Sequence, residues 1–186
     1  MFNYFSDAMS QSIYAILSNA SLLTKVRLPK EIFPLAKVLS CGINFLLSLI
    51  PMFFVAFFSG CRIHFSIFML PYNLFFFLLF ILGMSFILSS TMVFFRDISF
   101  IWNVISMLWM YSTPIFYPVT ILPGWMQNIE RLNPLWHFIN FFRIVLLEGK
   151  IPNINTFIGV SFSGIIVFSI GYLLFNKLKK SFVLYL

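Results

Sequence analysis

The residues of this sequence that could carry acid–base or metal chemistry are few and scattered. The acids are Asp7, Glu31, Asp97, Glu130 and Glu148, and the histidines are His64 and His137. They do not gather into the closely spaced sets of ligands that metal sites need. The sequence also has no glycine-rich phosphate loop and no nucleophile elbow. We therefore expect no catalytic residue, no metal site and no cofactor, and no capacity to hydrolyse ATP.

Three charged residues interrupt apolar surroundings and are more informative. The pair Arg96-Asp97 separates two apolar runs. It is either a stop signal at a helix end or a contact with a partner. Arg143 lies inside an apolar run that follows Pro134. An isolated Arg there is costly unless it reaches water, a carboxylate or a lipid headgroup. It either lines the outer mouth of a conduit or extends to the interface.

The composition places the whole chain in a membrane. Of its 186 residues, 61% are hydrophobic and 9% are charged, whereas a soluble domain carries about 25% charged residues. The net charge of +7 comes from short basic clusters between apolar runs, which is typical of topology-setting charges. We expect an integral membrane protein that does not bind nucleic acid.

The apolar runs predict one all-α domain over 1–186 with four transmembrane helices. Each run is about as long as the 20 residues that cross a bilayer, and together they cover 35–58, 67–95, 98–118 and 154–176. Helical spacing of apolar residues also predicts an amphipathic helix over 10–26. The segment 119–150 predicts two short helices, near 125–132 and 135–148, either as a re-entrant pair at the outer face or as an interfacial loop with an aromatic belt.

The basic residues predict the orientation. If four spans alternate, one side receives Lys25, Arg27, Lys30, Lys37, Arg96, Lys177, Lys179 and Lys180, and the other receives Arg62, Arg131, Arg143 and Lys150. The side that is richer in Lys and Arg is cytoplasmic by the positive-inside rule. We therefore expect a multi-pass membrane protein with a cytoplasmic C-terminus.

Five groups of motifs, in order along the chain, resemble one family. They are NASLLTKVRLP followed by KEIFPLA at 19–36, FFRDI at 94–98, TPIFYP at 113–118, LP at 122–123, and LNPL with FR at 132–135 and 142–143. This set resembles the type-2 permeases of ATP-binding-cassette exporters that move O-antigen, capsular polysaccharide or teichoic acid.

The resemblance implies a role for each motif. The cytoplasmic segment 8–31 would couple the permease to an ATPase subunit through Asn19, Leu22, Leu23, Lys25, Arg27 and Glu31. Arg96 and Asp97 would form a short cytoplasmic turn. The outer gate would consist of Thr113, Pro114, Tyr117, Pro118, Asn133, Pro134 and Arg143. The implied partners are the ATPase, a second copy of the permease as a homodimer, a lipid-linked glycan or polyol phosphate, and the membrane.

The resemblance also implies that the chain begins near the inner end of the family's second span, and so is N-terminally truncated. Two alternatives stay open. One is a membrane-bound transferase acting on lipid-linked sugars, which needs an acid or base within the membrane. The other is a nonfunctional permease fragment.

Overall fold

The computed structural model is a bundle of helices; it describes residues 1–25, 28–58, 65–115, 117, 119–121 and 123–182, and these contain no strand. The α-helices are α1 (Phe2–Ile13), α2 (Ala20–Lys25), α3 (Ile32–Phe58), α4 (Leu70–Phe94), α5 (Ile98–Ser112), α6 (Gly124–Glu130), α7 (Pro134–Arg143) and α8 (Ile154–Leu178). Short 3₁₀ turns cover Leu17–Asn19, Phe65–Met69 and Val119–Ile121, and a π-helical turn covers Ile144–Glu148.

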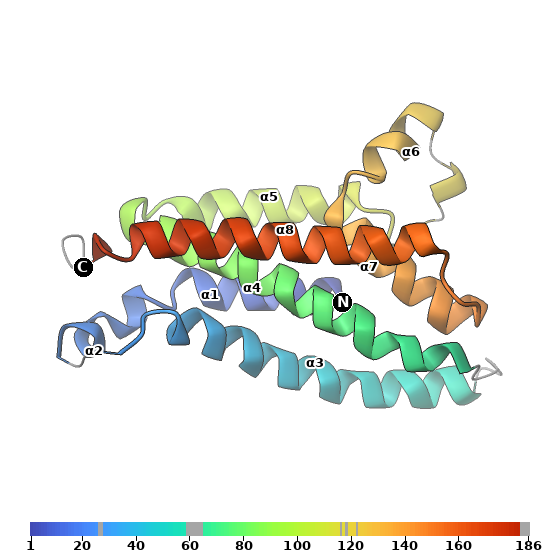
Figure 1. Cartoon of the computed structure of the whole chain (residues 1–186), viewed down its shortest axis with the longest axis horizontal. Helices are drawn as coiled ribbons and strands as arrows, with labels where there is room; N and C mark the ends of the chain where they lie inside the picture. Colours follow the sequence, from blue (N-terminus) through green and yellow to red (C-terminus); the bar gives the residue numbers. More distant parts are fainter. Residues whose placement is uncertain (26–27, 59–64, 116, 118, 122, 183–186) are drawn as a thin grey trace.

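The bundle has two distinct ends. Figure 1 shows α2, the turn between α4 and α5 and the end of α8 at one end, which we call the α2 end. The end of α3 and the start of α4, together with α6 and α7, lie at the other, which we call the α7 end. Basic residues on either side of the predicted membrane are therefore separated by the length of the bundle.

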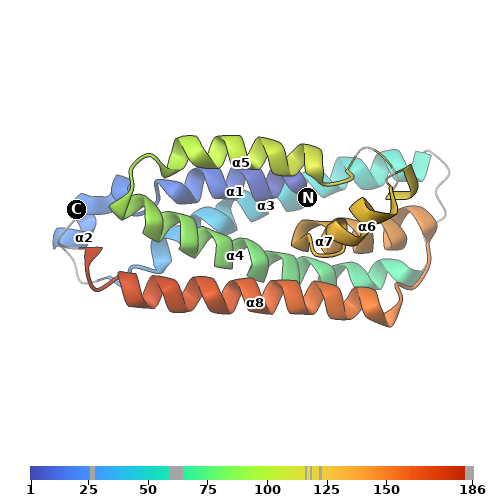
Figure 2. The same cartoon turned by 90° about the horizontal axis from the view of Figure 1, so that it is seen from above.

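Three helices are long and apolar enough to cross a membrane: Ile32–Val55, Phe65–Phe94 and Ile154–Leu178. They confirm the apolar helices expected over 35–58, 67–95 and 154–176. The helix containing α4 is central, because 56% of its most apolar stretch is buried, against 11% for α3 and 17% for α8. Figure 2 shows α4 running between α8 on one side and α1 and α5 on the other.

Glycines bring α4 and α8 into backbone contact. A Cβ atom added to Gly83 would collide with the backbone of Val167, and one added to Gly171 would collide with the backbone of Gly83. At Gly164 the added atom would lie 2.7 Å from the carbonyl oxygen of Phe76. Small residues permit such close approach between membrane helices, so the α4–α8 pair is the tightest element of the bundle.

The helix expected over 98–118 is shorter than predicted. α5 ends at Ser112, and Thr113 adopts an extended conformation with ψ of 129°. Thr113 precedes Pro114, and the residue before a proline is disfavoured in a helix. The fifteen residues of α5 rise about 22 Å at 1.5 Å per residue, which is less than the thickness of a typical hydrocarbon core.

The prediction of one amphipathic helix over 10–26 is wrong. α1 begins at Phe2 and ends at Ile13, and α2 begins only at Ala20. Phe5 of α1 is fully buried, with its ring 5.6 Å from that of Phe80 and 5.4 Å from that of Trp109. Packing of α1 into the bundle therefore overrides the apolar spacing that seemed to continue past Ile13.

Side chains between α1 and α2 stabilise the break between these two helices. The Ser18 hydroxyl donates to the Tyr14 carbonyl oxygen at 2.8 Å, and the Asn19 amide donates to the Ala15 carbonyl oxygen at 2.8 Å. Such local bonds from Ser and Asn compete with regular helix.

The two short helices expected after α5 are present as α6 and α7. Asn133 caps α7, because its side chain accepts a hydrogen bond from the Leu135 amide, and Pro134 occupies the first turn. Both residue types are favoured there. The π-helical turn that extends α7 ends at Gly149, whose φ of 61° is left-handed. Leu135, Phe138 and Phe141 are fully buried, so α7 packs into the bundle rather than lying on its surface.

Candidate functional site

Asn133 connects four segments at the α7 end. Its Oδ1 accepts hydrogen bonds from Trp109 Nε1 at 3.0 Å and from the Leu135 amide at 3.1 Å. Its Nδ2 donates to Thr113 Oγ1 at 2.9 Å and to Glu130 Oε2 at 3.2 Å. One side chain thus joins α5, the segment after it, α6 and α7.

Glu130 is a buried carboxyl within this cluster, with 5% of its surface exposed. Burial raises its pKa, and the hydrogen bond from Asn133 lowers it by less, so the net pKa lies above the ordinary value. Sequence reasoning assigned neither Glu130 nor Trp109 to the gate. Glu130 and Trp109 lie three and twenty-four residues before Asn133 in the sequence. That spacing does not indicate a contact, which arises only because α5 and α7 pack together.

Arg143 fixes the segment that follows α5. Its Nη2 donates to the carbonyl oxygens of Pro114 at 3.3 Å and Ile115 at 3.1 Å. These carbonyls lie where Pro114 has interrupted the helix. The Arg143 side chain therefore satisfies backbone groups in a segment where the helix no longer does so.

The structure brings most of the predicted gate residues into one region. Thr113, Pro114, Asn133 and Arg143 are linked directly or through one neighbour, and Pro134 opens α7 beside them. The Tyr117 hydroxyl donates to the carbonyl oxygens of Tyr111 and Ser112, both at 3.4 Å. Pro118 lies outside the described residues. We call Trp109, Thr113, Glu130, Asn133 and Arg143 the α7-end cluster.

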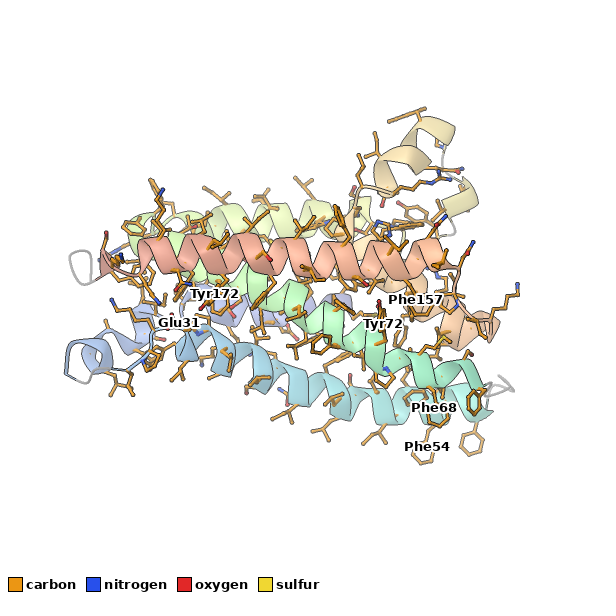
Figure 3. All side chains as sticks on the ribbon, viewed as in Figure 1. Glu31, Phe54, Phe68, Tyr72, Phe157 and Tyr172 are labelled. Carbon is orange, nitrogen blue, oxygen red and sulfur yellow. The ribbon has the colours of Figure 1, made fainter. Side chains whose placement is uncertain are left out.

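At the opposite end, an ion pair joins the first and last long helices. Lys179 Nζ lies 2.5 Å from Glu31 Oε1, and Lys30 Nζ donates to the Lys179 carbonyl oxygen at 2.7 Å. Lys30 Nζ also lies 5.4 Å from the centre of the Phe182 ring, a cation–π contact. Figure 3 shows Glu31 where the chain enters α3, near the end of α8.

These contacts set the ionisation of Glu31. Partial burial alone would raise its pKa, but the hydrogen bond from Lys179, a backbone hydrogen bond and the charges of Lys179 and Lys30 lower it. The net pKa of Glu31 lies below its ordinary value. Glu31 therefore holds α3 to α8 rather than projecting freely from the surface.

The remaining predicted coupling residues lie around α2. Leu22 is 47% exposed. The Asn19 amide is used in the local bond to Ala15. Leu23 and Lys25 are in α2, but their side chains, like all of Arg27, lie outside the described residues.

Arg96 and Asp97 form the turn between α4 and α5, also at the α2 end. Both side chains are exposed, and neither forms an ion pair with a described residue. Asp97 occupies the N-cap of α5, where a negative charge is favoured by the helix dipole.

The described residues offer no catalytic constellation. No group of three or more His, Cys, Asp and Glu side chains in that part of the chain could hold a metal ion. Cys41 is a buried free thiol. What the geometry provides instead is a helical bundle with one polar cluster at the α7 end and one charged junction at the α2 end.

Residues 2–147 match the ABC-2 type transporter family, which is most of the chain. The chain belongs to the ABC-2 type transporter family. Two O-antigen export system permease proteins RfbA from Klebsiella pneumoniae are 29% and 28% identical to this ABC-2 permease over 180 residues. A protein of the same name from Myxococcus xanthus is 24% identical over 181 residues. Each match covers 96% of this ABC-2 permease and 69–70% of the relative.

Family membership and three apolar helices identify a multi-pass membrane subunit of a transporter. All three relatives match over nearly the full length of this ABC-2 permease. Both the α2 end and the α7-end cluster therefore fall within the region of similarity.

Proposed function

We propose that this permease is the transmembrane subunit of an exporter that moves a lipid-linked polysaccharide or polyol phosphate across the bacterial inner membrane. The similarity to O-antigen export permeases over 96% of the chain carries the proposal. A separate ATPase subunit drives transport, and two copies of the permease enclose the conduit.

Four crossings fit the arrangement of the helices. α3, α4 and α8 run between the two ends of the bundle, and α5 begins at the α2 end and runs part of the way (Figure 1). α5 completes its crossing through the residues after Ser112, where Arg143 donates to the carbonyl oxygens of Pro114 and Ile115. α7 then packs back into the bundle before α8 begins, whereas α6 projects from it (Figure 1), so α7 is the part of the proposed re-entrant pair that enters the bundle. Irregular backbone at membrane depth is tolerated where protein covers it, and the burial of Thr113 and Pro114 provides that cover.

The α2 end faces the cytoplasm in this arrangement. Lys30, Arg96 and Lys179 lie there, together with Lys177 and Lys180, whereas Arg131, Arg143 and Lys150 lie at the α7 end. The richer cluster marks the cytoplasmic side. The C-terminus is then cytoplasmic, and α2 and the Arg96-Asp97 turn form the surface on which the ATPase docks.

The α7-end cluster is the outer gate. Asn133 and Arg143 hold the segment after α5 through side-chain hydrogen bonds alone. A passing glycan can displace such bonds with its own hydroxyl groups. The proposed gate residues are those of the motifs, Thr113, Pro114, Tyr117, Pro118, Asn133, Pro134 and Arg143, together with Trp109 and Glu130, which bond to Asn133.

Purification from membranes tests the proposal. A C-terminally tagged chain, expressed with the rest of its transport operon, should bring down an ATP-binding-cassette ATPase in mild detergent. Deleting the permease gene should leave the lipid-linked glycan on the cytoplasmic face. Normal surface display without the permease, or an intact complex that lacks an ATPase, would refute the exporter role.

One observation favours a second candidate, a membrane-bound transferase on lipid-linked sugars. Glu130 is a buried carboxyl with a raised pKa, which is a property of catalytic acids. Replacing Glu130, Glu148, Asp97 and His137 together with neutral residues should abolish glycosyl transfer if the chain is an enzyme. Retained transfer in that quadruple variant would exclude it.

A further inference from the structure

A polar groove runs between α1 and α3. Its volume is about 460 Å³. On α1 it is lined by Asn3, Asp7 and Gln11, which recur every four residues and so share one face. On α3 it is lined by Asn44 and Ser48, again four residues apart. None of these five positions was singled out by the sequence motifs.

The polar groups in the groove have few partners among the described residues. The side chains of Asn3, Asp7, Gln11 and Asn44 are exposed and form no hydrogen bond or ion pair with any described residue. Ser48 donates to the Phe45 carbonyl oxygen of its own helix at 2.7 Å. Each of these groups therefore has capacity left for water or a ligand.

The depth of the groove makes lipid an unsuitable neighbour. Asn44 lies at the middle of the Ile32–Val55 span. A charged side chain such as Asp7 costs about 3 kcal/mol at the centre of a membrane helix on insertion scales unless it meets water or a polar group, and a buried amide without a hydrogen-bond partner is also unfavourable. The opposite face of α3 behaves as a lipid surface should, because Leu46 and Ile50 are 55% and 54% exposed. α3 therefore presents polar side chains to the groove and apolar side chains on its opposite face.

The lining also restricts what can enter. It contains the Asp7 carboxylate, the three amides of Asn3, Gln11 and Asn44, the Ser48 hydroxyl and Met1, but no Lys or Arg side chain. Aromatic rings border it, since Tyr4 and Phe45 stack at 5.0 Å and Phe142 closes the side toward α7. Asp7 repels phosphate and other anions. Amide and carboxylate oxygens, by contrast, accept hydrogen bonds from hydroxyl groups, and aromatic faces cover apolar ring surfaces.

We propose that the groove between α1 and α3 is water-filled within the membrane and holds an uncharged, hydroxyl-rich stretch of the transported glycan. The proposal rests on the exporter function and narrows it, because an uncharged sugar segment fits this groove and a polyol phosphate does not. Asn3, Asp7, Gln11, Asn44 and Ser48 are its hydrogen-bonding residues.

Cysteine labelling in intact membranes tests whether the groove is hydrated. In a background with Cys41→Ala and Cys61→Ser, single variants Asn44→Cys and Ser48→Cys are treated with a membrane-impermeant trimethylammonium methanethiosulfonate. Leu46→Cys and Ile50→Cys, on the opposite face at similar depth, are the matched controls. Thiolates are the reactive species, and lipid raises the thiol pKa by more than a unit, so the groove variants should react at least about tenfold faster.

Ser48→Cys exchanges one oxygen for sulfur and preserves the fold, so the comparison does not depend on the larger substitutions. Equal reaction rates on the two faces would overturn the proposal. Labelling reports the access of water to the groove and does not measure export. Its outcome is therefore independent of whether an ATPase copurifies with the permease. Loss of the exporter role would leave the labelling ratio unchanged.

Charge and occupancy provide two further readouts. The trimethylammonium reagent should react faster with Asn44→Cys than its sulfonate counterpart, and Asp7→Asn should bring the two rates together. In cells that synthesise the glycan, labelling of Ser48→Cys should be slower than in cells whose first sugar-transfer step is blocked. Rapid labelling that synthesis does not alter would mean that the groove holds water but no sugar, and would overturn the assignment of its occupant.

Discussion

The Asn133 side chain makes four hydrogen bonds, to Trp109, Thr113, Glu130 and the Leu135 amide. An amide can accept and donate simultaneously, so no apolar or singly polar side chain can replace it. At the residue scale, the arrangement of the α7 end therefore depends on one position more than on any other in the described chain.

Replacing Asn133 with Leu should destabilise the protein by about 2–3 kcal/mol, because it removes the helix cap and leaves the buried Glu130 carboxyl without its donor. Thermal unfolding of the purified protein in one detergent, followed by tryptophan fluorescence, measures the effect. Asn153 is the matched control, since its side chain accepts only from the Ile154 amide. Asn153→Ala should cost about 1 kcal/mol. Equal losses in the two variants would contradict the role of Asn133 as a junction.

Glu130 and Glu31 should make the stability of the protein depend on pH in opposite directions. The pKa of Glu130 is raised above 4.5, so its contribution to stability is present at low pH and is lost as pH rises through that raised value. Glu130→Gln should therefore be more stable than the parent at neutral pH and similar at low pH. Stability curves between pH 4 and 8 check this.

Glu31 has a pKa lowered below 4.5, so its contribution is present above that pH and is lost as pH falls. Glu31→Gln should be less stable at neutral pH, by up to about 1 kcal/mol for a partly exposed ion pair. A change in stability of the same sign at neutral pH in both variants would show that the pKa values of the two carboxyls are not shifted in opposite directions.

At the scale of elements, α4 is held against α8 by backbone contact at Gly83 and Gly171. The contact explains why α4, although apolar all round, occupies one fixed position. Neighbouring helices in lipid gain little from burying apolar surface, so close packing must supply the specificity.

Gly83→Leu should force α4 and α8 apart, with a loss of stability of about 1–3 kcal/mol or, if the helices cannot separate, failure to fold. The smaller change Gly171→Ala keeps the test informative, since even one methyl group would meet the Gly83 backbone. Gly124→Ala is the control, because an added Cβ there meets no atom within 4 Å. Melting temperatures in detergent that are equal for Gly171→Ala and Gly124→Ala would refute the close contact.

The sequence predicted the long helices well and the short ones unevenly. Twenty or more apolar residues leave little choice in a membrane, so α3, α4 and α8 were expected nearly as they occur. α5 was expected to be longer, because its apolar run continues past Pro114. The buried position of α1 could not be predicted, since Phe5 and Met9 read equally well as interfacial residues until α4 and α5 surround them.

The functional residues, too, could be predicted only in part from the sequence. Motifs placed Thr113, Asn133 and Arg143 at one site, but the hydrogen bonds that join them to Trp109 and Glu130 depend on helix packing. The polar face of Asn3, Asp7 and Gln11 had a readable signal, a recurrence every four residues in an apolar chain. Its meaning appears only when Asn44 and Ser48 lie opposite.

For the whole molecule, the exposed Leu22 lies at the α2 end, where the proposed ATPase docks. Leu22→Asp should reduce glycan export without preventing insertion, because a charge enters an apolar contact with the partner. Ile151 is 69% exposed near the α7 end, so Ile151→Asp is the control and should export normally. Export and ATP hydrolysis measured together in membrane vesicles check the prediction. Normal export by Leu22→Asp would place the docking surface elsewhere.

The glycine contact between α4 and α8 has a mechanical consequence. Two helices whose main chains touch cannot slide or roll past each other by small steps, so they behave as a single stiff strut along the bundle. Glu31 and Lys179 attach the entry of α3 to one end of this strut, and α7 rests on the other through the fully buried Phe138 and Phe141. If the proposed ATPase moves the α2 end, that movement would reach the far membrane face with little loss, and the strut would act on the proposed gate without bending.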